Sequence, residues 1–106
     1  MIVDAIAERL GTNIVMLDMA GVSLLADYFV LCDAESPPQF RAILDEIDKQ
    51  TKAAGARRLH LEGEAESGWV LADYGSVVVH IFEPRLRQYY DLEGLWSQAR
   101  LVVRVQ

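Results

Sequence analysis

Three acidic residues alternate along a short stretch of the chain, at Glu62, Glu64 and Glu66. Carboxylate oxygens are ligands that Mg²⁺ and Ca²⁺ prefer, so this spacing is compatible with a cation site. Charged clusters of this kind more often form a solvated surface. We therefore interpret the stretch as an exposed acidic loop.

A second pair of carboxylates, Asp33 and Glu35, follows an apolar run. With Gly21 and Ser23 upstream, the pair resembles the arrangement of nucleotidyltransferases, in which two carboxylates hold Mg²⁺ against a nucleoside triphosphate. However, Gly21 and Ser23 are not adjacent, and no third carboxylate has an obvious place. A degenerate nucleotidyltransferase that retains nucleotide binding is therefore kept only as an alternative.

The remaining reactive side chains indicate no catalytic centre. His60 and His80 lie far from the single cysteine, Cys32, and neither has a second histidine one helical turn away. Metal-ligand spacing is therefore missing, and both histidines are interpreted as structural or surface residues. The sequence contains no Gly-x-Ser-x-Gly elbow and no phosphate-cradling loop. We expect a binding protein without catalytic residues, cofactor or metal.

Trp69 stands near the start of a predicted strand. Alternation places Trp69, Leu71 and Asp73 on one face, and the two smaller residues between them on the other. If the small side faces the packed layer, the first face stays open, with Tyr74 at its corner. Trp and Tyr often anchor interfaces. A core position for Trp69 is equally compatible with the sequence.

Composition limits the kind of partner. The 106 residues, of which 52% are hydrophobic and 25% charged, predict one globular domain over 1–106. The net charge of -6 disfavours direct nucleic-acid binding and favours a basic protein partner. The absence of a long apolar run and of a secretion signal after Met1 predicts a cytoplasmic protein without a membrane span.

Several local patterns predict the elements that position these residues. Apolar spacing predicts a helix over 1–10, with Gly11 as a left-handed cap. Ser36 and Gln39 form a predicted capping box around two prolines, and the helix they begin ends at Gly55. Its apolar face is predicted to consist of Phe40, Ile43, Leu44, Ile47 and Ala54; its polar face is predicted to consist of Asp45, Glu46, Asp48, Lys49 and Lys52.

The remaining patterns predict strands, a hairpin and two further helical segments. Strands are expected over 13–18, 27–32, 58–62, 69–73 and 76–82. Gly75 supplies the turn between the last two. Helical segments are expected over 84–90 and 91–96, and 101–106 is either a terminal strand or a tail. The resulting class is α/β, with a mixed sheet of about five strands covered by helices.

Several separated motifs together resemble the signature of the ribosomal silencing factors, the Iojap-like family. The longest is Gly68-Trp69-Val70-Leu71-Ala72-Asp73-Tyr74-Gly75-Ser76-Val77-Val78-Val79-His80-Ile81-Phe82. Further matches are Leu17-Asp18, Gly21, Ser23, Ala26-Asp27-Tyr28-Phe29-Val30, Glu62-Gly63, Tyr89-Tyr90-Asp91-Leu92-Glu93 and Leu95-Trp96. The resemblance spans nearly the whole chain. It implies a mixed α/β domain related to the nucleotidyltransferase fold but without that fold's catalytic residues.

The resemblance also implies a function. The family docks on the fourteenth large-subunit ribosomal protein and blocks small-subunit joining sterically, so translation falls when nutrients are scarce. Carried over, the binding residues are Trp69, Leu71, Asp73 and Tyr74. A homodimer of the free chain is a further expectation. The segment from Asp33 to Gln39 departs from the family's usual Thr-Gly-Thr-Ser type loop and histidine, which puts any role of that loop in doubt.

Overall fold

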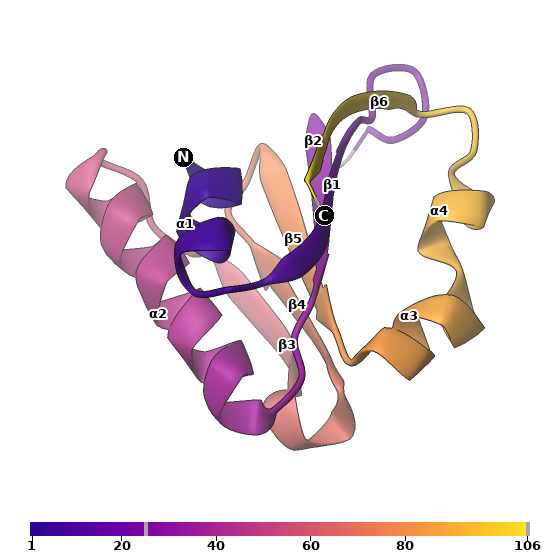
Figure 1. Ribbon diagram of the computed structural model, residues 1–106. Helices are drawn as coiled ribbons and strands as arrows, with labels where there is room; N and C mark the ends of the chain where they lie inside the picture. Colours follow the sequence, from indigo (N-terminus) through magenta and orange to yellow (C-terminus); the bar gives the residue numbers. More distant parts are fainter. Residues whose placement is uncertain (25, 106) are drawn as a thin grey trace.

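A mixed six-stranded sheet lies between two pairs of helices in the computed structural model, which describes residues 1–24 and 26–105 (Figure 1). The strands are β1 (Thr12–Asp18), β2 (Tyr28–Asp33), β3 (His60–Glu64), β4 (Trp69–Asp73), β5 (Val77–Phe82) and β6 (Arg100–Val105). Their order is β3-β4-β5-β2-β1-β6. The β2–β5 pair is parallel, and the other neighbours are antiparallel. The predicted α/β class with a mixed sheet is confirmed.

The predicted number of strands was too low by one. The segment after Arg100, which was left open between a strand and a tail, pairs antiparallel with β1 as β6. Its β-branched residues suit an extended backbone, and β1 would otherwise present an open edge. The turn between β4 and β5 forms as expected, with Gly75 at φ 93°.

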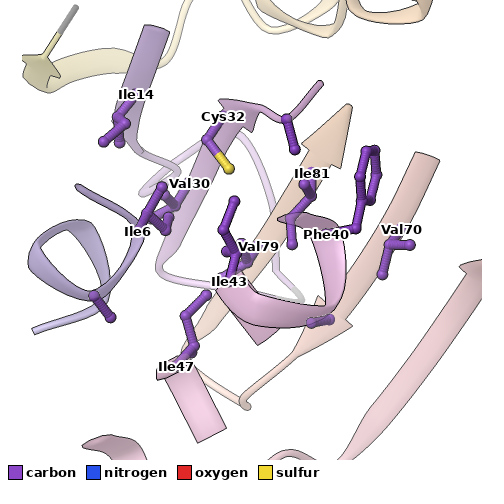
Figure 2. Close-up of a cluster of buried hydrophobic side chains, with 13 residues drawn as sticks. Ile6, Ile14, Val30, Cys32, Phe40, Ile43, Ile47, Val70, Val79 and Ile81 are labelled. Atoms are coloured by element: carbon purple, nitrogen blue, oxygen red, sulfur yellow. The ribbon is translucent and has the colours of Figure 1, made fainter. Parts of the chain in front are cut away.

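The helices α1 (Ile2–Glu8) and α2 (Pro37–Ala53) cover one face of the sheet. Figure 2 shows the core between them and the strands, in which Phe40, Ile43 and Ile47 of α2 meet apolar residues of the central strands. This cluster consists of Ala5, Ile6, Ile14, Val30, Cys32, Ala34, Phe40, Ile43, Ile47, Val70, Ala72, Val79 and Ile81.

The start of α2 follows the predicted capping chemistry with one change. Ser36 Oγ accepts a hydrogen bond from the Gln39 backbone N–H at 3.3 Å, as expected. The Gln39 side chain accepts from the Glu35 N–H at 2.7 Å rather than from Ser36. Gln39 Nε2 also donates to the Leu10 carbonyl at 2.9 Å. The cap therefore also ties the start of α2 to the end of α1.

The end of α1 differs from the prediction. Leu10, not Gly11, adopts the left-handed conformation, with φ 64°. Gly11 is required for space instead, because a Cβ atom there would lie 2.3 Å from Ile6 Cγ2. At the end of α2, Gly55 adopts the left-handed conformation common after a helix C-terminus, with φ 88°.

One residue of the predicted polar face of α2 is buried. Glu46 is 5% exposed, because α1 packs beside it, and it accepts a 2.8 Å hydrogen bond from Arg9. Hydrogen bonds from Gln50 and Arg9 lower the pKa of Glu46 below its usual value. Ala54, predicted on the apolar face, is the exposed C-cap.

The helices α3 (Pro84–Tyr90) and α4 (Leu92–Leu95) lie on the opposite side of the sheet (Figure 1). Asp91 caps α4, accepting from the Gly94 N–H at 3.2 Å. The core on this side consists of Val15, Leu17, Met19, Ala26, Phe29, Leu31, Val78, Phe82 and Leu92. Within residues 1–24 and 26–105, no helix is long and apolar enough to cross a membrane.

Candidate protein-binding surface

Strand register determines which side chains accompany Trp69. Val70 and Ala72 are buried beneath α1 and α2, so Trp69 and Leu71 face the α3 side, and the predicted alternation is confirmed. Directly opposite residues of paired strands point to the same side. Glu64 pairs with Trp69, and Glu62 pairs with Leu71. Glu62, at the end of the predicted strand, and Glu64, predicted to lie in the acidic loop, therefore both belong to an edge strand beside Trp69.

Glu66, the third of the alternating acidic residues, points to a different partner. Glu66 lies in the short 3₁₀ helix η1 (Ala65–Ser67) and forms an ion pair with Arg41 of α2. Glu62 instead contacts His60 at 3.0 Å. The three carboxylates are thus not gathered around one point. The described part of the chain contains no group of three or more His, Cys, Asp or Glu residues placed to hold a metal ion.

The Trp69 ring is held by aromatic neighbours. It stacks on Phe82 at a centroid distance of 4.9 Å and contacts Tyr90 at 4.8 Å. Its Nε1–H donates to His80 Nδ1 at 3.3 Å. Trp69 is neither fully exposed nor a core residue; it is partly buried with its ring fixed in position.

His80 supports the Trp69 ring from beneath, a role that the sequence did not reveal. It is 3% exposed, and burial lowers its pKa to about 4. A neutral ring with an unprotonated Nδ1 is needed to accept the Trp69 hydrogen bond. His80 Nε2 has no hydrogen-bond partner within the described residues, and the Phe29 ring lies 5.1 Å away between centroids. The alternation of β5 could have indicated this role, because it places His80 opposite Leu71 on the side of the sheet that carries Trp69.

A cleft of about 420 Å³ opens between the β3–β4 pair and α3. Its lining combines aromatic and aliphatic surface with one carboxylate: Glu62, Gly63, Ser67, Trp69, Leu71, Leu86 and Tyr90. We call it the Trp69 cleft. Leu86 and Tyr90 of α3 therefore cover part of a face that the sequence predicted to be open. An apolar cleft with a polar rim is suited to receive a side chain or short segment of another protein.

Tyr74 does not belong to this surface. It packs against the α1 and α2 side, and its hydroxyl donates to Asp48 Oδ1 at 2.7 Å. Arg58 binds the other oxygen of Asp48 at 2.8 Å, and burial together with Asp48 raises the Tyr74 pKa. The expected corner position is therefore corrected, because the alternation that aims Asp73 toward the cleft side aims Tyr74 to the opposite side. Asp73 is partly buried and accepts from the Gly75 N–H at 2.8 Å.

The carboxylate pair considered for nucleotide chemistry is separated. Asp33 is 5% exposed, and its two oxygens accept from Arg87 at 3.0 Å and from Asn13 at 2.9 Å. Glu35 is exposed and lies outside this network. Because both Asp33 oxygens are engaged by protein donors, the pair does not form an open cation site.

Comparison with known proteins shows the family of the chain. The family model described as "Ribosomal silencing factor during starvation" matches residues 1–106. The chain belongs to this family. The predicted resemblance is thereby confirmed, and with it a role as a ribosomal silencing factor that regulates translation.

Relatives of this silencing factor extend over most of its length. The ribosomal silencing factor RsfS of Bacillus subtilis is 45% identical over 94 residues, covering 89% of this chain and 80% of that protein. A crystal structure from Chromobacterium violaceum superimposes with a TM-score of 0.85 at 32% identity, covering 91% of this chain and 80% of the other. A mouse protein named "Mitochondrial assembly of ribosomal large subunit protein 1" is 27% identical over 100 residues, covering 92% of this chain and 44% of its own.

Proposed function

We propose that this silencing factor binds the large ribosomal subunit through the Trp69 cleft. Its partner there is the fourteenth large-subunit ribosomal protein, as the family resemblance implies. Bound at the intersubunit surface, the domain blocks joining of the small subunit by occupying its space. This mechanism needs no reaction, so we assign no catalytic residue.

The observation that carries this proposal is the partly buried Trp69, which lines an apolar cleft. Its ring is fixed by Phe82, Tyr90 and the His80 hydrogen bond before any partner arrives. A fixed aromatic anchor loses little side-chain entropy on binding, so more of its contact energy contributes to affinity. Leu71 extends the apolar area, and Asp73 lies further along the same face of β4.

The charges around the cleft favour a basic partner. Glu62 lines the cleft, Glu64 is exposed on the same strand, and Asp73 lies further along the same face. Ribosomal proteins are commonly basic, and complementary charge accelerates association and disfavours wrong partners. The nucleotide-binding alternative lacks comparable support, because Asp33 is neutralised by Arg87 within the protein.

Replacement of Trp69 by alanine tests the proposal. We expect Trp69→Ala to weaken binding to purified large subunits by about 30-fold, since truncating a central aromatic anchor commonly costs ~2 kcal/mol. Co-sedimentation over a range of subunit concentrations measures the change. Trp96→Phe is the matched control, because Trp96 lies on the same side of the sheet without lining the cleft, and phenylalanine keeps an aromatic ring against Phe29 and His80.

If Trp69→Ala binds large subunits as tightly as wild type, the cleft is not part of the interface. If the folded wild-type protein does not bind large subunits, the proposed function is wrong. The steric mechanism is tested separately, by light scattering of large and small subunits mixed with and without the protein. The same method applied to free wild type and Trp69→Ala shows whether a homodimer uses this cleft.

A further inference from the structure

The far wall of the Trp69 cleft is a short helix with few connections to the sheet. Leu86 and Tyr90 lie one helical turn apart on α3 and contribute to the cleft together. At its start, α3 is tied to the sheet by the Glu83 N–H, which donates to the Gly68 carbonyl at 2.8 Å. Besides the apolar packing of Leu86 and Tyr90, a further polar tie is the side chain of Arg87, the residue that follows Leu86.

Arg87 enters a buried network on the sheet. Nη1 donates to Asp33 Oδ1 at 3.0 Å and also to the Asn13 carbonyl. Nε and Nη2 donate to the two oxygens of Glu93 at 3.0 and 3.2 Å. Asn13 Nδ2 completes the network by donating to Asp33 Oδ2 at 2.9 Å. One guanidinium group thus joins α3 to β1, β2 and α4.

The burial and geometry of this network restrict the position of α3. Arg87 is 8% exposed and Asp33 is 5% exposed. Burial opposes the charge of Arg87, but the hydrogen bonds with Glu93 and Asp33 outweigh it and raise the Arg87 pKa. A planar guanidinium fork accepts few geometries, so these bonds restrict the position of the helix that carries it.

We propose that Asp33 and Arg87 are positioning residues that hold α3 at the distance from β4 which the Trp69 cleft requires. Displacement of α3 moves Leu86 and Tyr90 away from Trp69, so the cleft widens and the ring loses its Tyr90 contact. The consequence for ribosome binding rests on the proposed function, whereas the consequence for the Trp69 environment does not.

The chain offers a matched pair of variants to test this. Asp33→Asn and Glu46→Gln each replace a carboxylate that is 5% exposed and paired with an arginine, but Glu46 lies between α1 and α2 on the opposite side of the sheet. Both are made in a Trp96→Phe background, in which Trp69 is the one remaining tryptophan. Acrylamide quenching of Trp69 fluorescence and binding to large subunits are measured well below both unfolding temperatures.

We expect Asp33→Asn to raise the Trp69 quenching constant about twofold and to weaken subunit binding about tenfold, because α3 is released from the sheet. Glu46→Gln leaves both quantities within experimental error, even where its thermal stability falls equally. Equal effects of the two variants, or unchanged quenching in Asp33→Asn, overturn the proposal. If Asp33→Asn does not fold, Arg87→Lys provides the same test, because lysine keeps the positive charge but lacks the planar fork that bonds Asp33.

The two proposals fail in different ways. Absence of wild-type binding to subunits, with higher quenching in Asp33→Asn, contradicts the proposed function and leaves the positioning role intact. Wild-type binding that depends on Trp69 but is unchanged in Asp33→Asn contradicts the positioning role alone.

Discussion

At the scale of the residue, His80 connects the protein core to the Trp69 cleft. Its ring is buried among Phe29, Trp69, Phe82 and Trp96, and its Nδ1 accepts the indole N–H of Trp69. Protonation of Nδ1 would remove the acceptor and place a charge in an aromatic environment. The orientation of Trp69 therefore depends on a neutral His80.

This dependence predicts that stability falls in mild acid. The pKa of His80 is about 4 in the folded protein, whereas an unfolded histidine titrates near ~6.5. Between these values the unfolded chain binds a proton that the folded chain does not, so the free energy of unfolding decreases as the pH falls. The total decrease from this residue is about 3 kcal/mol. Urea unfolding of wild type and His80→Gln at several pH values measures it.

Glutamine is a suitable replacement because its side-chain oxygen can accept the Trp69 hydrogen bond without titrating. Other groups with shifted pKa values, such as Asp18 and Glu46, are present in both proteins and affect both curves. We expect the stability difference between the two proteins to be constant above about pH 7 and to move in favour of His80→Gln below it. Parallel curves down to about pH 4.5 would show that His80 does not titrate in this way.

Side-chain direction was predictable at some positions and not at others. Strand alternation correctly placed Trp69 and Leu71 on one face, since a period of two holds within one strand. Continued alternation beyond β4 points Tyr74 away from Trp69, and the predicted corner position did not follow that alternation. Its hydrogen-bond partner, the distant residue Asp48, was hidden from the sequence. The engagement of Asp33 by Arg87 was equally hidden, because the two are 54 positions apart in the chain.

At the scale of the element, α2 is the helix whose bounds and buried face depend most clearly on its own sequence. Ser36 and the two prolines set its start, and its apolar stripe matches the buried face except at its end. Glu46 was assigned wrongly because its burial depends on α1, which local periodicity cannot describe. The last strand, β6, was ambiguous because an exposed apolar run becomes a strand only when β1 is there to pair with it.

The Ser36 cap gives a quantitative test at this scale. Ser36→Ala removes the side-chain acceptor of the Gln39 N–H and is expected to lower the free energy of unfolding by about 1 kcal/mol. Chemical denaturation measures the loss. Ser76→Ala, at an exposed position in the β4–β5 turn, is the control and should change stability much less. An equal loss in both variants would mean that the Ser36 hydrogen bond adds nothing to the stability of α2.

At the scale of the whole molecule, some acidic residues form ion pairs within the protein, whereas others are exposed beside the Trp69 cleft. Several acids are paired within the protein, as in Arg9–Glu46, Arg41–Glu66 and Arg87–Asp33. Glu62 and Glu64 lie exposed on β3 beside the Trp69 cleft. The negative sign of the long-range electrostatic field could be predicted from composition alone. The position of these two acids beside Trp69 could not, because it depends on the register between β3 and β4.

If the field guides a basic partner to the cleft, association with the isolated ribosomal protein should slow as salt rises, while dissociation changes little. Stopped-flow fluorescence measures both rates. The double variant Glu62→Gln and Glu64→Gln should show a weaker salt dependence than wild type. The control, Asp4→Asn and Asp45→Asn, removes the same charge from α1 and α2, and equal salt dependence of the two double variants would argue against local steering.

The pairing of β6 with β1 also has a consequence for how the chain is made. The Arg100–Asp18 contact joins residues 82 positions apart, whereas the β1–β2 and β4–β5 pairs each connect neighbouring segments. During synthesis β1 therefore leaves the ribosome well before its outer neighbour has been translated. Until then the nascent chain carries β1 with an unpaired edge, which is the kind of edge that other chains can join. A repressor of translation thus carries an incomplete sheet through much of its own synthesis.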